Sequence, residues 1–308
     1  MSTTRDFDLL VVGDLNADLI LCGDVEPTFG QVEKLIDDAT LTLGGSTAIF
    51  ACGAARLGLR VALVGKVGDD EFGRFIVREM NTRGVNTEGV ATDPQVKTGL
   101  TVILSHGNDR AMLTYSGSIS ALRFAEIDRA LIARARHLHV ASYFLLDALR
   151  PDIPALFDLA RVSGLTVSLD TNYDPTEKWN SGLADALRRA DVFLPNETEL
   201  HAIAGIADTE AALEWLASGG AMVAVKCGAR GAMARRGSER ASAQALVVDV
   251  VDTTGAGDTF DAGFIFGYLA GWELARALRL GCVCASLSTR AAGGTAAQPK
   301  LAEALEKL

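Results

Sequence analysis

The sequence predicts an α/β fold built on a doubly wound, mainly parallel sheet flanked by helices, with a small β-sheet lid. Strand-like apolar runs alternate with segments of helical periodicity over most of the 308 residues, which is the pattern of parallel βαβ units with right-handed crossovers. Two β-rich regions, about residues 16–43 and 96–118, interrupt this alternation, so we expect them to form a separate small sheet. Because no shift in composition divides the chain, we expect residues 1–308 to form a single domain.

The individual strands and helices are predicted from two periodicities. Apolar and β-branched runs predict strands at residues 7–13, 61–67, 137–140, 165–169, 192–194, 221–225 and 245–250, the first and last of them buried. Apolar residues at helical spacing predict helices at 44–58, 71–82, 152–163, 179–190, 197–204, 209–218, 258–271 and 273–291. Short runs at 19–21, 39–43, 98–105 and 110–116 predict the lid strands, the last two joined by a turn at 106–109.

Composition narrows the possible functions. The formal net charge of −10 argues against a nucleic-acid-binding protein. No apolar run reaches the length of a membrane span, and the charged start of the chain is unlike a secretory signal, so we expect no membrane partner. The five cysteines are scattered and include no Cys-x-x-Cys pair, which predicts reduced thiols in a cytoplasmic protein and argues against a zinc site.

One stretch, residues 251–260, combines the features of an anion-binding turn. The small residues Gly255, Ala256 and Gly257 lie between a predicted strand and a predicted helix. Successive backbone amides therefore point into one concavity at the positive end of the helix dipole, which suits a phosphate group. Asp258 follows in the first helical turn, where we expect its carboxylate to be held ionised at neutral pH, as an acceptor of a hydroxyl proton must be. The alternative is an ordinary helix start in which Asp258 only stabilises the first turn.

Polar residues also follow other predicted strands. Asn16 and Asp18 come after the first strand, at the edge where open α/β sheets bind ligands, although ordinary turn chemistry would also explain them. Asn196 and Glu199 follow the strand at 192–194, and their spacing fits either a ligand site or a helix capping box. By themselves, neither of these pairs decides between the two interpretations.

The motif Asp-Thr-Thr-Gly-Ala-Gly-Asp at residues 252–258 resembles the C-terminal signature of the ribokinase family of carbohydrate kinases, also called the PfkB family. Residues 44–73 resemble its N-terminal signature, and the resemblance covers nearly the whole chain in the right order. It implies a ribokinase-like fold and ATP-dependent phosphoryl transfer to a hydroxymethyl group of a sugar or sugar-like substrate. The resemblance makes Asp258 the catalytic base. The family's anion hole corresponds to the backbone amides of Gly255, Ala256 and Gly257.

The same resemblance assigns the remaining site residues and partners. Substrate binding is implied for Asn16, Asp18, Gly44 and Gly45. ATP binding is implied for Asn196, Glu199, Lys226, Gly228, Gly231 and Thr253, with Glu199 orienting the water shell of the Mg²⁺ that bridges the phosphates. A site for a monovalent cation such as K⁺ is implied at Asp252 and Thr254. Several family members form homodimers through the lid, so we expect the same contact here.

Two departures from the family pattern bear on the substrate. Ile49 stands where the family usually has an asparagine that contacts the sugar. This weakens the case for ribose or fructose and keeps a nucleoside kinase open. Asp174 stands where members that phosphorylate acidic sugars often carry arginine, which counts against a sugar-acid substrate.

Three other classes of protein fit less well. A non-catalytic sugar sensor on this fold would be expected to lose the base or the anion hole, and both are present. A dinucleotide-dependent oxidoreductase would need Gly-x-Gly-x-x-Gly after the first strand, which the residues following Gly13 lack. A Walker-type NTPase would need Gly-Lys-Ser/Thr, and Gly65-Lys66-Val67 fails that requirement.

Overall fold

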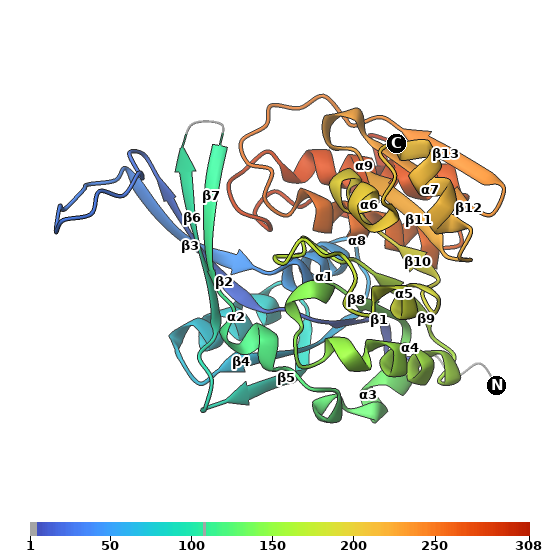
Figure 1. Cartoon of the computed structure of the whole chain (residues 1–308), viewed down its shortest axis with the longest axis horizontal. Helices are drawn as coiled ribbons and strands as arrows, with labels where there is room; N and C mark the ends of the chain where they lie inside the picture. The colour runs from blue at the N-terminus through green and yellow to red at the C-terminus, as the bar shows by residue number, and fades with distance from the viewer. Residues whose placement is uncertain (1–4, 107–108) are drawn as a thin grey trace.

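The computed structural model describes residues 5–106 and 109–308. A nine-stranded sheet runs through the centre with helices on both of its faces, and a four-stranded sheet stands off one side (Figure 1). This arrangement confirms the predicted doubly wound fold with a β-sheet lid. Within the described part of the chain, no helix has both the length and the apolar character that crossing a bilayer requires.

The central sheet has the strand order β13-β12-β11-β10-β9-β8-β1-β4-β5. The bounds of its strands are β1 (Phe7–Val12), β4 (Val61–Gly68), β5 (Asn86–Asp93), β8 (Ala135–Val140), β9 (Thr166–Leu169), β10 (Val192–Phe193), β11 (Met222–Lys226), β12 (Ala232–Arg236) and β13 (Glu239–Ala243). Strands from β11 to β5 pair in parallel, whereas β12 and β13 are antiparallel. The chain adds β4 on one side of β1 and later β8 on the other, so the carboxyl edge beside β1 is a topological switch point, where open α/β sheets bind ligands.

The helices cover both faces of this sheet. Their bounds are α1 (Ser46–Arg56), α2 (Glu71–Thr82), α3 (Arg129–Ala133), α4 (Ile153–Val162), α5 (Leu183–Leu187), α6 (Glu197–Ala204), α7 (Thr209–Ala217), α8 (Ala256–Leu269), α9 (Leu274–Ser288) and α10 (Leu301–Leu305). Side chains alternate along a strand, and β1 shows the consequence. Leu10 and Val12 belong to the core beneath α3 to α7, whereas Leu9 and Val11 belong to the core beneath α1, α2, α8, α9 and α10.

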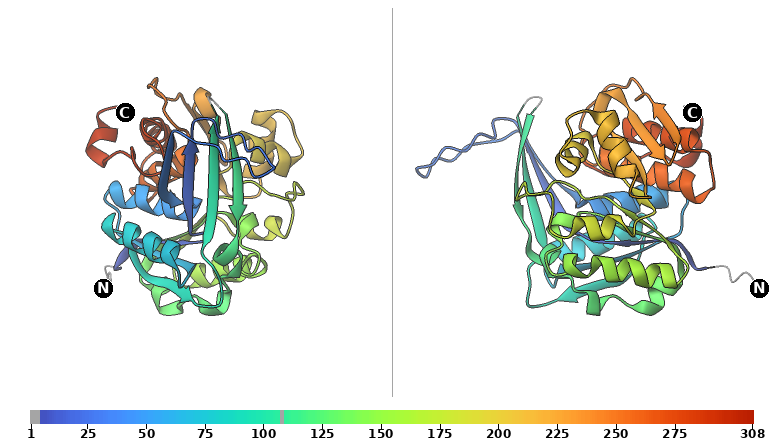
Figure 2. Two further views of the ribbon diagram at one scale, coloured as in Figure 1. Left: turned by 90° about the vertical axis from the view of Figure 1, so that its left-hand side faces the viewer. Right: turned by 45° about the vertical axis from the view of Figure 1, so that its right-hand side comes forward.

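The lid consists of β2 (Asn16–Cys22), β3 (Asp38–Gly44), β6 (Gly99–His106) and β7 (Asp109–Tyr115), in the order β3-β2-β6-β7. Strands β2, β6 and β7 lie within the two β-rich regions expected from the sequence, and β3 extends one residue beyond the first of them. The turn expected at 106–109 includes residues 107 and 108, which lie outside the described residues. The connection between β2 and β3 extends away from the body of the molecule (Figure 2).

The strand predicted at 245–250 is wrong. These residues form no strand, and Val247 is fully exposed. The segment runs along α9 instead, where the amide of Leu246 donates to the hydroxyl of Ser286 (3.0 Å) and the amide of Val251 donates to the carbonyl of Thr289 (2.8 Å). Strand β13 already forms this edge of the sheet, so the β propensity of the segment is overridden by its tertiary position.

The helix predicted at 179–190 is also wrong in its extent, because α5 covers only Leu183–Leu187. Trp179, Ser181 and Gly182 have φ values of 55°, 45° and 83°, which no α-helix accommodates. The carboxylate of Asp174 organises this turn by accepting hydrogen bonds from the backbone amides of Thr176, Lys178 and Trp179.

Strand β5 was not predicted, since its sequence Asn-Thr-Glu-Gly-Val-Ala-Thr-Asp has no run of large apolar residues.

Candidate active site

The predicted glycine turn opens helix α8, as the sequence indicated. Gly255 is the N-cap residue and adopts φ 70°, in the left-handed region that favours glycine. A Cβ atom at Gly255 would lie 2.8 Å from the Cα of Gly294 and 2.8 Å from Cγ2 of Ile49. The backbone of the turn therefore packs too closely against its neighbours for any side chain at this position. Ile49, the departure from the family's asparagine, is buried behind the turn.

Gly255 and the two residues that follow it are those predicted to form the anion hole. The amide of Ala256 donates to the carbonyl oxygen of Thr253 (3.2 Å), which closes the turn. Gly257 lies in the first turn of α8, where helix amides have no acceptor within the helix. A Cβ atom at Gly257 would make only ordinary contacts, the nearest 3.7 Å away on Lys226. The space beside Gly257 can therefore accept an anionic group close to the backbone.

Asp258 occupies the first turn of α8, as predicted, and is half-buried. Burial raises the pKa of its carboxyl to about 7, and the charge of Asp170 adds to this effect. Lys226 and a hydrogen bond with the Ser46 side chain act in the opposite direction. The carboxyl of Asp258 therefore titrates near neutral pH and is not kept fully ionised by the helix dipole, because burial and the charge of Asp170 outweigh the influences that favour ionisation. A pKa close to 7 still suits a general base that works near neutral pH.

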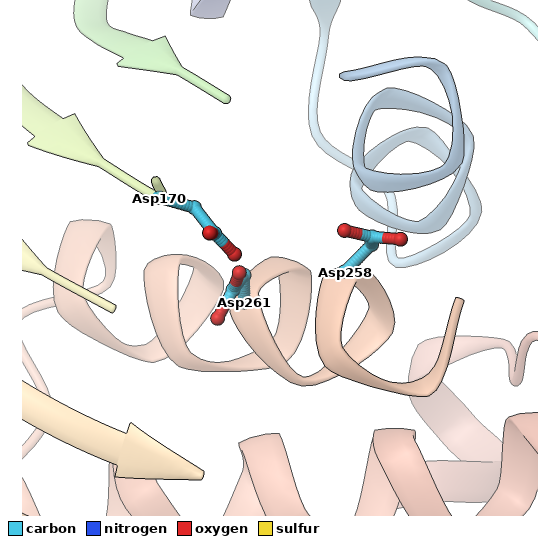
Figure 3. Close-up of side chains that lie close together, drawn as sticks. All are labelled: Asp170, Asp258 and Asp261. Atoms are coloured by element: carbon cyan, nitrogen blue, oxygen red, sulfur yellow. The ribbon is translucent and has the colours of Figure 1, made fainter. Parts of the chain in front are cut away.

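Asp258 belongs to a cluster of carboxylates that the sequence did not reveal. One carboxylate oxygen from each of Asp170, Asp258 and Asp261 lies within 4.8 Å of the others. Figure 3 shows Asp170 approaching from the end of its strand, β9, while Asp261 lies further along α8 than Asp258. Lys226, predicted to bind ATP, directs its ammonium to this cluster, with Nζ 2.7 Å from Asp170 and 2.9 Å from Asp261. The three-residue spacing of Asp258 and Asp261 within one helix was the available signal.

The predicted acceptor residues lie on the first lid strand rather than in a turn. Asn16 and Asp18 are the first and third residues of β2, and both are buried. The side-chain amide of Asn16 donates to Asp18 (2.7 Å) and to the hydroxyl of Thr101 on β6 (3.2 Å). Burial raises the pKa of Asp18 to about 7, with Asp14 and Asp258 adding to the rise and Arg110 opposing it. Asp18 and Asp258 are therefore close enough for the charge of one to influence the other.

The glycines predicted beside the substrate make room for these carboxylates. A Cβ atom at Gly44 would lie 2.0 Å from Oδ1 of Asp18, so the carboxylate could not occupy its position next to any other residue. Gly45 has φ 87° and is the N-cap of α1. Asp14, which the sequence reasoning missed, accepts hydrogen bonds from the amides of Ser46 (3.2 Å) and Thr47 (3.0 Å) at the start of that helix. Asp14 thus holds α1 against the end of β1.

Asn196 and Glu199 form the capping box that their spacing allowed. The Asn196 side chain accepts from the amide of Glu199 (2.9 Å), and the Glu199 carboxylate accepts from the amide of Asn196 (2.9 Å). Glu199 is nevertheless buried, and burial raises its pKa to about 7, with the charge of Asp170 in the same direction and Lys226 opposed. A capping box alone needs no such burial, so the geometry is compatible with both interpretations of this pair.

The residues predicted to hold a monovalent cation are engaged with the lid. Oδ1 of Asp252 accepts from the amide of Thr254 (2.9 Å), and Oδ2 accepts from the amide of Gly293 (2.8 Å). Arg110 on strand β7 donates to Asp252 (3.2 Å) and to the hydroxyl of Thr254 (2.6 Å). Arg110 was not found from the sequence, since it lies far away in the chain. Thr253, predicted to bind ATP, is exposed beside this contact.

The two glycines predicted to line the nucleotide differ in their surroundings. Gly228 has φ 59°, is exposed, and has no atom within 4 Å of a Cβ position, so its backbone is accessible to a ligand. Gly231 is buried, and a Cβ atom there would lie 2.0 Å from the carbonyl oxygen of Ala243 at the end of β13. Gly231 therefore has a packing role irrespective of any nucleotide.

The fold and the site define a class of protein before any comparison is made. A glycine turn at a helix start, a carboxylate in its first turn and further carboxylates at the carboxyl edge of a doubly wound sheet characterise a phosphotransferase with an alcohol group as acceptor. The model of the pfkB family carbohydrate kinases matches residues 6–301. The chain belongs to this family of sugar kinases.

Two relatives of known name cover nearly the whole chain. The 5-dehydro-2-deoxygluconokinase of Geobacillus kaustophilus is 29% identical over 97% of this chain and 92% of its own length. The ATP-dependent ribose-1-phosphate kinase of Halopiger xanaduensis is 32% identical over 94% of each chain. Among solved structures, a candidate ribokinase II from E. coli in complex with ATP and Mg²⁺ aligns with a TM-score of 0.85 and 22% identity, over 97% of this chain and 98% of its own. This likeness supports the ribokinase-like fold.

Proposed function

We propose that this kinase transfers the γ-phosphoryl group of ATP to a hydroxymethyl group of a sugar or sugar-like acceptor. The observation that carries the proposal is Asp258, which directly follows the glycine turn and has a pKa of about 7. From this position it would accept the proton of the acceptor hydroxyl as the hydroxyl oxygen attacks the phosphorus. The amides of the turn would stabilise the charge on the transferred group.

The acceptor would lie between the lid and helix α8. Asp18 would accept charge-assisted hydrogen bonds from two vicinal hydroxyls, and Asn16 fixes its carboxylate in place. Ile49 lies behind the glycine turn and offers only hydrocarbon, so recognition of the acceptor would depend on the lid residues. ATP would lie at the other end of the cleft, near the accessible backbone of Gly228. Such an arrangement works by positioning and electrostatics, without a covalent intermediate.

A sugar or a sugar derivative is favoured over a nucleoside as the acceptor. The names of the two relatives describe kinases of 5-dehydro-2-deoxygluconate and of ribose 1-phosphate, and both align over nearly the full chain. The two names specify different acceptors. Both compounds therefore belong in any test of substrates, together with unmodified pentoses and hexoses.

The donor atoms of the site fit a magnesium ion. Glu199, Asp170 and Asp258 supply carboxylate oxygens, the atoms that Mg²⁺ prefers. The pKa of Glu199 and that of Asp258 are raised by burial and by neighbouring negative charge, which a divalent cation would offset. Glu199 would hold the ion through its water shell. Bound there, Mg²⁺ would neutralise charge on the β- and γ-phosphate oxygens of ATP.

A monovalent cation beside Asp252 also belongs to the proposal, and comparing rates in potassium and choline salts would measure its effect.

A second copy of the chain is the partner that we propose for the lid. Leu41, Val102 and Leu113 lie in register on the same lid face as Leu19, and Leu41 and Leu113 are exposed. An apolar sheet face of this kind usually marks an interface. We therefore include a homodimer through the lid in the proposal.

Four of the five cysteines are buried and all five are free thiols, which is consistent with a cytoplasmic protein.

Replacing Asp258 with asparagine tests the proposed chemistry. The variant keeps the size of the side chain but cannot accept a proton, so kcat should fall by at least ~10²-fold, the lower end for loss of a general base. ATP binding, measured by calorimetry, should change little. Asp249→Asn, which alters an exposed carboxylate outside the site, is the matched control. Near-normal turnover by Asp258→Asn would contradict the assignment.

Truncating Asp18 to alanine tests where the acceptor binds. Losing its hydrogen bonds should lower kcat/KM for the acceptor, by a factor that corresponds to ~2–4 kcal/mol of lost transition-state stabilisation. This figure takes each charge-assisted hydrogen bond at roughly 1.5–3 kcal/mol and allows for water replacing part of the interaction. KM for ATP should stay nearly constant. Asp38→Ala removes an exposed carboxylate from the neighbouring strand β3 and should leave both parameters unchanged. If Asp18→Ala instead weakened ATP binding, the inferred polarity of the cleft would be wrong.

Replacing Glu199 with glutamine separates its two possible roles. Glutamine retains an oxygen that accepts from the backbone amide of Asn196, which preserves the helix cap, but it loses the second acceptor, which the side-chain amide of Asn196 uses, so only a modest fall in melting temperature is expected. The Mg²⁺ concentration required for half-maximal rate should rise. Glu197→Gln, in the same helical turn, should not change it. An unaltered magnesium dependence in Glu199→Gln would leave this residue with only its capping role.

Placing a charge on the lid tests the homodimer. Leu113→Asp would bury a carboxylate in the proposed interface and should convert a dimer into a monomer in sedimentation experiments. The neighbouring residue Met112 is also exposed but points to the opposite face of β7, so Met112→Asp should leave the association state unchanged. A wild-type chain that sediments as a monomer at micromolar concentration would rule out this part of the proposal.

A further inference from the structure

Arg110 joins the lid to the segment that precedes helix α8. It lies on β7, an edge strand of the lid, and its Nη1 donates to Oδ1 of Asp252 (3.2 Å) and to the hydroxyl of Thr254 (2.6 Å). The side chain of Arg110 is 35% exposed and that of Asp252 is 19% exposed, so the contact is partly withdrawn from water. A charge-assisted hydrogen bond in such a place is stronger than a contact between fully exposed side chains.

The side chain of Arg110 extends from the same lid face as that of Asp18. Thr114, four residues further along β7, pairs with Thr101 on β6, and Thr101 in turn pairs with Asp18 on β2. Residues paired across strands lie on one face of a sheet, and so do residues separated by an even number along a strand. Arg110 and the carboxylate proposed to bind the acceptor are therefore carried by one face of one small sheet.

The carboxylate of Asp252 holds the backbone on two sides of the glycine turn. Oδ1 accepts from the amide of Thr254 (2.9 Å), the residue immediately before Gly255, and Oδ2 accepts from the amide of Gly293 (2.8 Å). Gly294, the next residue, lies against the turn, since a Cβ atom on Gly255 would be 2.8 Å from the Cα of Gly294. A displacement of Asp252 would therefore move both segments that determine the position of Gly255.

The opposite edge of the lid lies against the second of these segments. A Cβ atom at Gly293 would be 3.2 Å from Oγ1 of Thr42, which belongs to β3, the other edge strand. The lid thus contacts Asp252 and Thr254 through β7, and Gly293 through β3. The contact at Thr42 is a packing contact, whereas Arg110 contributes hydrogen bonds, whose directionality fixes the relative position of the two parts.

We propose that Arg110 is a positioning residue for phosphoryl transfer, which acts from the lid through Asp252 and Thr254 to fix the glycine turn before α8. This inference rests on the proposed function, because the turn is where the transferred phosphoryl group would bind. Displacing such a turn by about 1 Å can lower a rate by about 10²-fold, since its amides then miss the position where charge develops.

Hydrogen exchange measured by mass spectrometry tests the role of Arg110 without turnover. In Arg110→Met, Asp252 and Thr254 lose a charged hydrogen-bond donor, so the backbone amides of residues 251–256 should exchange with solvent at least ~10-fold faster than in the wild type. Circular dichroism should show that the fold is retained. Unchanged exchange of residues 251–256 in Arg110→Met would overturn the proposal.

Arg136→Met is the matched control for the loss of an arginine. Arg136 also contacts a carboxylate, that of Asp8 (3.2 Å), and a second oxygen, the carbonyl oxygen of Leu269 (3.2 Å), but these partners lie outside the candidate site. The exchange of residues 251–256 should be the same in Arg136→Met as in the wild type. Equal acceleration in both variants would mean that Arg110 has no specific effect on the turn.

Kinetics separate positioning of the turn from direct binding of the acceptor. Ribose and ribose 1-phosphate form a pair of acceptors that differ in charge. With each of them that the wild type phosphorylates, Arg110→Met should lower kcat by ~10-fold or more and leave KM for ATP near the wild-type value. Arg110→Lys retains a cationic donor and should recover part of this loss. A raised KM confined to the charged acceptor, with normal kcat, would overturn the proposal in favour of direct binding.

A double variant tests whether Arg110 acts through its partner. Thr254→Val removes the hydroxyl that accepts from Arg110, so kcat should fall in this variant as well. In Arg110→Met/Thr254→Val the loss should be smaller than the product of the two single losses, because both substitutions remove the same contact. Losses that simply multiply would show that the two residues act independently, which would contradict the proposal.

The exchange experiment also separates this inference from the proposed function. If the wild type phosphorylates no acceptor, the proposed function fails. The exchange of residues 251–256 in Arg110→Met and Arg136→Met still decides whether Arg110 fixes the turn.

Discussion

Crowding of carboxylates at the carboxyl edge of the sheet is the constraint on which the site depends. Asp18, Glu199 and Asp258 each have a pKa raised to about 7, in every case first by burial. Withdrawing such groups from water opposes folding unless nearby partners compensate. The chain supplies those partners individually: Asn16 donates to Asp18, the capping box engages Glu199, and Lys226 opposes the accumulated charge. These partners offset the crowding only in part, since the pKa of each of the three carboxyls stays raised.

Close approach of backbone and side chain makes this concentration possible. The doubly wound sheet brings the ends of β1, β9, β10 and β11 to one edge, and the lid strand β2 returns over it. Gly44 leaves room for the carboxylate of Asp18, while Gly255 lets the turn before α8 pack against Gly294. Arg110 then connects the lid to the residues just before that turn. The lid is thus linked directly to the residues that precede helix α8.

Local patterns in the sequence were sufficient for much of the fold and for the glycine turn at the start of α8. Helices α2 and α6 have the bounds that their periodicity and caps predict, and the glycine turn opens α8 as expected. The strand predicted at 245–250 failed because β propensity does not reveal that β13 already forms the sheet edge. The ion cluster of Lys226 and Asp170 and the contact of Arg110 with Asp252 join residues distant in the chain, so no local pattern could reveal them.

The most direct test of the whole account is a screen for ADP release from ATP and Mg²⁺ with pentoses, hexoses, sugar phosphates, 5-dehydro-2-deoxygluconate and nucleosides. We expect one sugar or sugar derivative to give rapid ADP release together with an equal amount of phosphorylated acceptor. Phosphorus–proton correlation NMR of that product should place the phosphate on a hydroxymethyl oxygen. Release of inorganic phosphate without a sugar product, or phosphorylation of nucleosides alone, would contradict the account.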